Sequence, residues 1–178
     1  MFVRQAEQLG LGHAVLCAQR AVGGDPFAVL LADDFLTDYE PGVTVDLVDA
    51  FASSGKSQIS VMEVDGPDIS KYGVVVPNGA GAAIAGLVEK PEAHDAPSNL
   101  ASIGRYVLTP DIFETLWSLS AGSGGEIQLA DAINIHAQQD SVEIIKLNGK
   151  RFDCGSVEGL MRATIHGFRT RFPDENIY

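Results

Sequence analysis

The chain has 178 residues, and its 46% hydrophobic content is enough for one domain with a substantial core. It carries 24 acidic and 12 basic residues, and the resulting net charge of −12 repels nucleic acid and anionic membranes. No apolar run approaches membrane-spanning length, and the first residues lack the apolar core of a signal peptide. We therefore expect a cytoplasmic protein that binds neither nucleic acid nor membrane. Its two cysteines are too few for a disulfide framework.

Strand-like apolar runs alternate with stretches of helical periodicity along the whole chain. In chain order, we expect a helix over 12–22, a strand at 27–31, a helix that stops near Gly55, strands at 58–64, 72–76, 83–88 and 103–108, helices over 109–119 and 126–138, a strand at 142–147 and a helix over 156–172. This order predicts an α/β fold with a mostly parallel sheet and flanking helices. We find no internal repeat or linker, so residues 1–178 are treated as one domain.

Two of these elements carry a specific expectation about burial. The run 27–31 is continuously apolar, as a strand buried on both faces should be. Ser156 is a suitable N-cap for the last helix. Helical spacing in this helix predicts inward positions for Val157, Leu160, Met161, Thr164 and Phe168.

Acidic residues follow two of the predicted strands. Asp33 and Asp34 come directly after the first strand, and Asp153 lies in a loop after the strand 142–147. Ligands of α/β sheets bind beyond the carboxyl ends of the strands. Two carboxylates brought together there would suit Mg²⁺, which takes hard oxygen ligands. The alternative is that each Asp forms a turn or caps a helix.

Glu89-Lys90-Pro91 ends another strand with an acid and a base side by side. Neighbouring strand residues point to opposite faces, so the two side chains would serve separate parts of one ligand. A carboxylate that accepts sugar hydroxyls beside an ammonium that neutralises a phosphate would suit a sugar phosphate. The alternative is an ordinary solvated strand end.

Gly10 and Gly12 precede the first helix, where the backbone can approach a flat base or a phosphate closely. Two glycines at this spacing are also typical of a tight turn into a helix.

Ten motifs occur in an order that matches a known family. They are 2–5 (FVRQ), 10–15 (GLGHAV), 26–29 (PFAV), 31–34 (LADD), 72–75 (YGVV), 88–91 (VEKP), 97–101 (PSNLA), 104–108 (GRYVL), 125–129 (GEIQL) and 153–155 (DCG). Together they closely resemble bacterial UTP–glucose-1-phosphate uridylyltransferases, also called UDP-glucose pyrophosphorylases. The resemblance implies a Rossmann-like nucleotidyltransferase fold and, as partners, UTP, glucose 1-phosphate and UDP-glucose.

The resemblance also implies roles for individual residues. Gln5 and Gly10 match positions that lie against the nucleotide base and ribose, and Asp33 and Asp153 match the acids that bind Mg²⁺. Asp33 is thereby one of the two predicted catalytic residues.

The sugar side of the site is implied in the same way. Gly73 matches a backbone contact to the hexose, Glu89 a carboxylate that takes sugar hydroxyls, and Lys90 an ammonium that meets the sugar phosphate. Lys90 is the second predicted catalytic residue. The implied reaction is attack by the phosphate oxygen of glucose 1-phosphate on the α-phosphorus of UTP, with release of pyrophosphate and no covalent enzyme intermediate.

One departure from the family pattern concerns the N-terminal part of the fold. Family members begin upstream of Phe2 with a strand and a glycine-rich loop whose Arg and Lys hold the triphosphate. The sequence is therefore interpreted as an incomplete catalytic domain, and we expect the isolated chain to be inactive or nearly so. A non-catalytic regulatory or binding homologue that associates with a full-length uridylyltransferase, and a related sugar-phosphate transferase that uses dTTP, remain as alternatives. Family resemblance further implies a homo-oligomer, with the helix 156–172 as the candidate interface.

Overall fold

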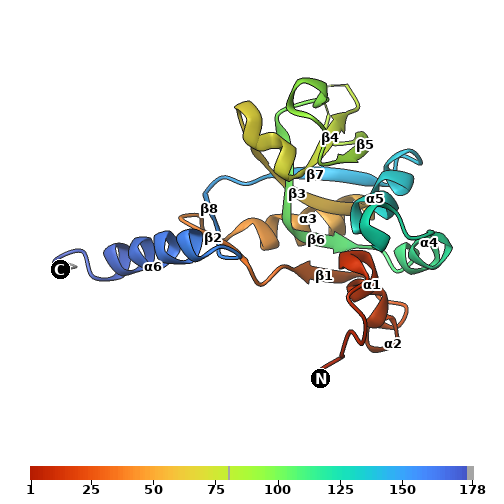
Figure 1. The fold of residues 1–178 in the computed structure, drawn as a ribbon, viewed down its shortest axis with the longest axis horizontal. Helices are drawn as coiled ribbons and strands as arrows, with labels where there is room; N and C mark the ends of the chain where they lie inside the picture. Colours follow the sequence, from red (N-terminus) through yellow and green to blue (C-terminus); the bar gives the residue numbers. More distant parts are fainter. Residues whose placement is uncertain (80, 176–178) are drawn as a thin grey trace.

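The computed structural model describes residues 1–79 and 81–175 as an α/β body from which one long helix extends (Figure 1). The strands are β1 (Phe27–Leu30), β2 (Asp34–Thr37), β3 (Ser57–Glu63), β4 (Gly73–Pro77), β5 (Ile84–Glu89), β6 (Leu100–Leu108), β7 (Val142–Lys146) and β8 (Lys150–Asp153). The α-helices are α1 (Gly10–Cys17), α2 (Gln19–Val22), α3 (Val43–Ser54), α4 (Ile112–Ser118), α5 (Leu129–Ala137) and α6 (Val157–Arg171). Short 3-10 helices cover Gly66–Lys71, Ala93–Asp95 and Ser123–Gly125.

The main sheet has the order β5-β4-β6-β3-β7, and β1 also pairs with β6. The predicted α/β class with flanking helices is confirmed, but the expected mostly parallel pairing needs a correction. Four strands, β1, β3, β4 and β7, share one direction, yet only β3 and β7 are paired in parallel. The reason is that β6 runs the opposite way between them, so that its ladders with β1, β3 and β4 are antiparallel.

Strand β6 has one edge that two strands share. β3 pairs along one edge, from Leu100 to Val107, while β1 pairs with residues 105–108 and β4 with Ala101 on the other. β1 and β4 therefore leave β6 uncovered around 102–104. This interruption opens the sheet beside Gly104, and a cavity that is more enclosed than those beside Ile69 and Phe152, called the principal cavity below, lies there.

Helices cover both faces of the sheet (Figure 1). α1, α4 and α5 pack on one face around a core that includes Ile59, Leu108 and Phe113, and α3 packs on the other around Leu47 and Val107. The alternation of Val107 and Leu108 between the two cores follows from the two-residue period of a strand. Gly55, with φ +71°, ends α3 in the left-handed conformation, as its position in the sequence predicts.

Two predictions about burial are wrong. β1 is not buried on both faces, because Ala28 and Leu30 are exposed while Phe27 stacks on Phe113. In the described residues β1 pairs with β6 alone, so it is an edge strand with one covered face.

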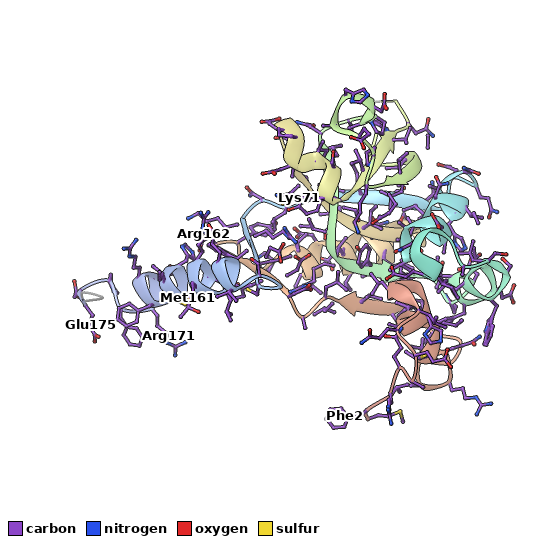
Figure 2. All side chains as sticks on the ribbon, in the orientation of Figure 1. Phe2, Lys71, Met161, Arg162, Arg171 and Glu175 are labelled. Carbon is purple, nitrogen blue, oxygen red and sulfur yellow. The ribbon has the colours of Figure 1, made fainter. Side chains whose placement is uncertain are left out.

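The face of α6 that was predicted to point inward is mostly exposed, and of its five residues Phe168 alone is half-buried. Val157, Leu160 and Met161 are all more than half exposed, and Ala163 is the buried residue of the helix. Ser156 caps α6 as expected, since its Oγ accepts a hydrogen bond from the Gly159 N–H. Figures 1 and 2 show why the apolar face stays open: α6 runs away from the body, with Met161 and Arg171 beyond it. Within 1–79 and 81–175, no helix has the length and apolar character needed to cross a membrane.

A second sheet of two strands, β2 and β8, was not predicted. Asp34 is paired with Asp153 and Thr37 with Lys150 in antiparallel register. The sheet brings together two segments that lie more than 100 positions apart in the chain. It places the acidic residues after β1 beside the acidic residue that precedes α6.

Candidate functional site

The principal cavity lies between the β2–β8 sheet, the open edge of β6, the ends of β4 and β5, and the N-terminal end of α5. Its volume is about 250 Å³, and its polar lining is Asp33, Asp34, Lys71, Tyr72, Gly73, Glu89, Ser102, Gly104, Gln128, Arg151 and Asp153. Leu11, Leu87, Leu129 and Ile133 are among its apolar residues. A concave site with an apolar base and converging polar groups is the usual form of a small-molecule site.

Asp33 and Asp153 lie on either side of Gly155. A methyl group on Gly155 would be 3.1 Å from Asp153 Oδ1 and 3.3 Å from Asp33 Oδ2, so both carboxylates face the same small space. The Cys154 N–H donates to the Asp33 carbonyl at 2.7 Å, and the Gly155 N–H donates to Asp153 Oδ1 at 3.0 Å. These backbone bonds fix the turn that presents the two acids.

This pair of carboxylates fits Mg²⁺. In the described residues, no group of three or more His, Cys, Asp or Glu side chains is suited to a metal ion. Mg²⁺ is usually held by one or two carboxylates, with water and substrate phosphates in the other positions. Asp33 and Asp153 would therefore hold the ion, and the remaining coordination positions would be filled from the cavity.

Asp34 has a different role from its neighbour Asp33. It is 4% exposed, its Oδ2 accepts from the Gly104 N–H at 2.6 Å, and its Oδ1 accepts from Arg151 Nε at 2.6 Å. Arg151 Nη2 forms an ion pair with the same carboxylate. Arg151 also donates to the Tyr72 hydroxyl at 2.9 Å and lies over the Tyr72 ring. Both acids line the cavity, but the Asp34 carboxylate is already held by Arg151 and Gly104, so Asp33 is the better candidate for a ligand.

Gly73 and Glu89 are directly paired across β4 and β5. Glu89 Oε2 is 3.1 Å from the position that a Cβ on Gly73 would occupy, so the carboxylate lies over the Gly73 backbone. Burial raises the pKa of Glu89, and the charge of Asp131 adds to the shift, while Lys90 opposes it. A desolvated carboxylate of this kind gains by accepting hydrogen bonds from ligand hydroxyls.

Lys90 does not line the cavity. Its side chain is 63% exposed, and its Nζ lies 3.7 Å from Glu89 Oε1. The backbone at Lys90 is left-handed, with φ +45°, and its N–H donates to the Tyr72 carbonyl at 3.0 Å. Glu89 lines the cavity and Lys90, which follows the end of β5, does not, yet the two side chains remain close enough to pair.

Gln5 and Gly10 lie outside the cavity lining. Gln5 Nε2 donates to the Gly10 carbonyl at 3.1 Å and lies 3.0 Å from His13 Nδ1. Gly10, with φ +89°, needs to be glycine because a Cβ there would be 2.8 Å from Glu126 Cβ. The neighbouring Leu11 does line the cavity. The nucleotide-binding role of Gln5 and Gly10 stays a prediction.

The cavity thus unites four of the seven predicted site residues: Asp33, Asp153, Gly73 and Glu89. It also contains two cations that the sequence did not reveal, Lys71 and Arg151. Lys71 is 69% exposed and pairs with Asp68, three residues earlier, at 2.8 Å. A signal for Arg151 existed in the sequence, because it lies two residues before Asp153 and so shares its face if the segment is a strand.

Comparison with known proteins shows the family to which the chain is related. The sequence model of the nucleotidyl transferase family matches residues 1–167. A UTP–glucose-1-phosphate uridylyltransferase from Pseudomonas aeruginosa is 43% identical over 92% of the chain, and uridylyltransferase 2 from Staphylococcus saprophyticus is 45% identical over the same share. The chain spans 60% and 57% of the length of these two relatives.

Solved structures give the same result. A UDP-glucose pyrophosphorylase in complex with UDP-glucose superimposes with a TM-score of 0.90 at 40% identity, covering 96% of this chain and 66% of that one. The UTP-bound enzyme from Acinetobacter baumannii has a TM-score of 0.83 at 41% identity, covering 94% and 59%. The resemblance drawn from the sequence motifs is confirmed. The family match over nearly the whole chain, together with these relatives, shows that the chain belongs to the nucleotidyl transferase family.

Proposed function

We propose that the protein carrying this chain is a UTP–glucose-1-phosphate uridylyltransferase, which forms UDP-glucose and pyrophosphate from UTP and glucose 1-phosphate. The observation that carries the proposal is the convergence of Asp33 and Asp153 with Gly73 and Glu89 in one cavity. It joins a pair of acids suited to a metal ion with a carboxylate and a backbone segment suited to a sugar. The names and ligands of the relatives support the same reaction.

The hexose would lie beside Gly73 and Glu89, since the Glu89 carboxylate takes the space that a side chain on Gly73 would fill. Glu89 would accept hydrogen bonds from two of its hydroxyls, which offsets the cost of burying this carboxylate. Lys90 would meet the sugar phosphate by turning from Glu89. The 3.7 Å separation between Lys90 Nζ and Glu89 Oε1 makes the present pair weak and readily exchanged.

The reaction needs little covalent chemistry from the protein. The phosphate oxygen of glucose 1-phosphate attacks the α-phosphorus of UTP, and the bond to the pyrophosphate group breaks. Positioning of the two substrates and neutralisation of their charges are the effects that dominate such transfers. Lys90 supplies one positive charge, and Asp33 and Asp153 hold the site for Mg²⁺. When bound, the ion would neutralise phosphate charge that the chain, with its net charge of −12, would otherwise repel.

Pyrophosphate release from UTP and glucose 1-phosphate tests the proposed reaction. Lys90→Ala should reduce turnover by about 100-fold, as removal of one preorganised charge typically does. Lys146→Ala is the matched control, because Lys146 is a similarly exposed lysine paired with Glu63 outside the cavity. Unchanged turnover in Lys90→Ala would refute the role of Lys90. A higher kcat/KM with dTTP than with UTP would favour the related thymidylyl transfer instead.

Two further features complete the proposal. The protein would act in the cytoplasm, and it would form a homo-oligomer through the exposed face of α6. Leu160 and Met161 on that face support the second point, since both are more than half exposed. Light scattering should report an oligomer that Leu160→Glu dissociates, and a monomer in the unaltered protein would contradict it.

A further inference from the structure

Arg151 contacts both halves of the candidate site at once. On one side its Nε and Nη2 hold the Asp34 carboxylate, and on the other its Nη1 donates to the Tyr72 hydroxyl at 2.9 Å. The Arg151 side chain is only 12% exposed. Its guanidinium also lies 5.2 Å from the centre of the Tyr72 ring. A planar guanidinium that bonds Asp34 with one side and Tyr72 with the other connects the two residues rigidly, and the single ammonium of a lysine cannot reproduce this geometry.

The Asp34 end of this connection leads to the metal-binding acids. Asp34 is adjacent to Asp33 in the chain and is paired across β2 and β8 with Asp153. The Gly104 N–H and Arg105 Nη2, which donates to the Asp34 carbonyl at 2.9 Å, fix the same residue to β6. Movement of Asp34 would therefore move both acids.

The Tyr72 end leads to the sugar-binding residues. Tyr72 precedes Gly73 directly, and its carbonyl accepts the Lys90 N–H at 3.0 Å. Gly73 is paired in turn with Glu89. The position of the Tyr72 backbone therefore sets the position of the groups proposed to hold the hexose and its phosphate.

No other described side chain links these two halves of the cavity by hydrogen bonds. β1 and β4 lie on the same edge of β6 but do not pair with each other, and the cavity separates them. Lys71, the other lining cation, pairs with Asp68 on its own segment. We propose that Arg151 is a positioning residue that joins the Asp33–Asp153 pair to the Gly73–Glu89–Lys90 group, so that metal binding and sugar-nucleotide binding strengthen each other.

The expected coupling between ligands rests on the proposed function, but the connection of the two segments by Arg151 does not. Tyr72→Phe removes only the hydroxyl that Arg151 holds, and leaves the ring and the backbone in place. Tyr39→Phe is the matched control, because the Tyr39 hydroxyl donates a similar bond to Asp46 at 2.6 Å outside the cavity. Arg151→Lys keeps the charge beside Asp34 while it removes the fork.

The first measurement needs no ligand. Hydrogen exchange of the Lys90 amide, which reports the bond to the Tyr72 carbonyl, should become faster in Tyr72→Phe and Arg151→Lys by about threefold or more. The Tyr39→Phe variant should match the unaltered protein at this amide. Equal exchange in Tyr72→Phe and Tyr39→Phe would overturn the proposal, whatever the protein binds.

The second measurement is calorimetric binding of UDP-glucose with and without Mg²⁺. Coupling between two sites is typically about 5-fold or more in affinity, and it is reciprocal. We expect Mg²⁺ to tighten UDP-glucose binding to the unaltered protein and to Tyr39→Phe, and to have much less effect in Tyr72→Phe. Undiminished coupling in Tyr72→Phe would overturn the positioning role. If the unaltered protein binds no UDP-glucose, the proposed function is wrong, and the exchange result alone decides whether Arg151 joins the two segments.

Discussion

Replacement of Arg151 by leucine should destabilise the protein severely. Asp34 is 4% exposed, and among the described residues Arg151 is the one cation that contacts its carboxylate, which without it would keep the Gly104 N–H as its partner. Removing one partner of a buried ion pair typically costs about 3–5 kcal/mol, since the other charge stays buried without compensation. This is a large part of the total stability of an ordinary domain, which is about 5–15 kcal/mol.

Urea unfolding measures this loss. With a slope near 2 kcal/mol per molar urea, the midpoint of Arg151→Leu should fall by about 2 M. Arg162→Leu is the control, because Arg162 also pairs with a carboxylate, that of Glu158, but both groups are more than 70% exposed. A pair in solvent contributes little. The double variant Asp34→Asn with Arg151→Leu should recover part of the loss, since the amide can still accept from Gly104 without a buried charge.

Equal shifts of the urea midpoint in Arg151→Leu and Arg162→Leu would show that burial of the Asp34 charge does not determine the loss. The same conclusion would follow if the double variant were less stable than Arg151→Leu alone. In that case the guanidinium would stabilise the fold by packing against Tyr72 rather than by compensating Asp34.

The other predictions concern single groups. Burial raises the pKa of Glu89 above its ordinary 4.5, so the free energy of unfolding falls as the pH rises through 4.5 and the folded pKa. The urea midpoint of Glu89→Gln should therefore be higher than that of the unaltered protein at neutral pH but not at low pH. The same variant should bind UDP-glucose more weakly. Gly155→Ala puts a methyl group 3.1 Å from Asp153 Oδ1, and should weaken Mn²⁺ binding measured by electron paramagnetic resonance, whereas Gly167→Ala, with no atom within 4 Å, should not. Lys150 and His166 lower the pKa of Asp38 from 3.8 to about 2, so exchange protection of α6 should be lost as the pH falls through that interval, and Asp38→Asn should show no such step.

The sequence was informative where local chemistry decides the structure. Gly55 and Ser156 mark helix ends because they meet backbone requirements of the helix itself. The meeting of Asp33 and Asp153 was expected from acids at strand ends, but the structure brings them together through the separate β2–β8 pair.

Features that depend on distant partners were not predictable. β2 and β8 are strands of only four residues, and β8 has three charged residues among them, so neither shows an apolar alternation until each is seen beside the other. The antiparallel course of β6 and the exposed face of β1 likewise depend on which strands are neighbours. The one sign of Arg151 in the sequence was its two-residue spacing from Asp153. That sign was weak, because a charged residue in an unassigned segment looks like a solvated one until Asp34 and Tyr72 are seen beside it.

Because α6 extends from the body, its susceptibility to proteolysis should differ from that of the rest of the molecule. Its attachment includes contacts with β8, the His166 ring on Phe152, and the bond between His166 and Asp38. No residue of α6 lines the principal cavity. A protease should therefore cut within α6 before it attacks the sheet. The trimmed body would keep every wall of the cavity, so digestion offers a direct way to tell what the helix contributes to assembly from what the body contributes to binding.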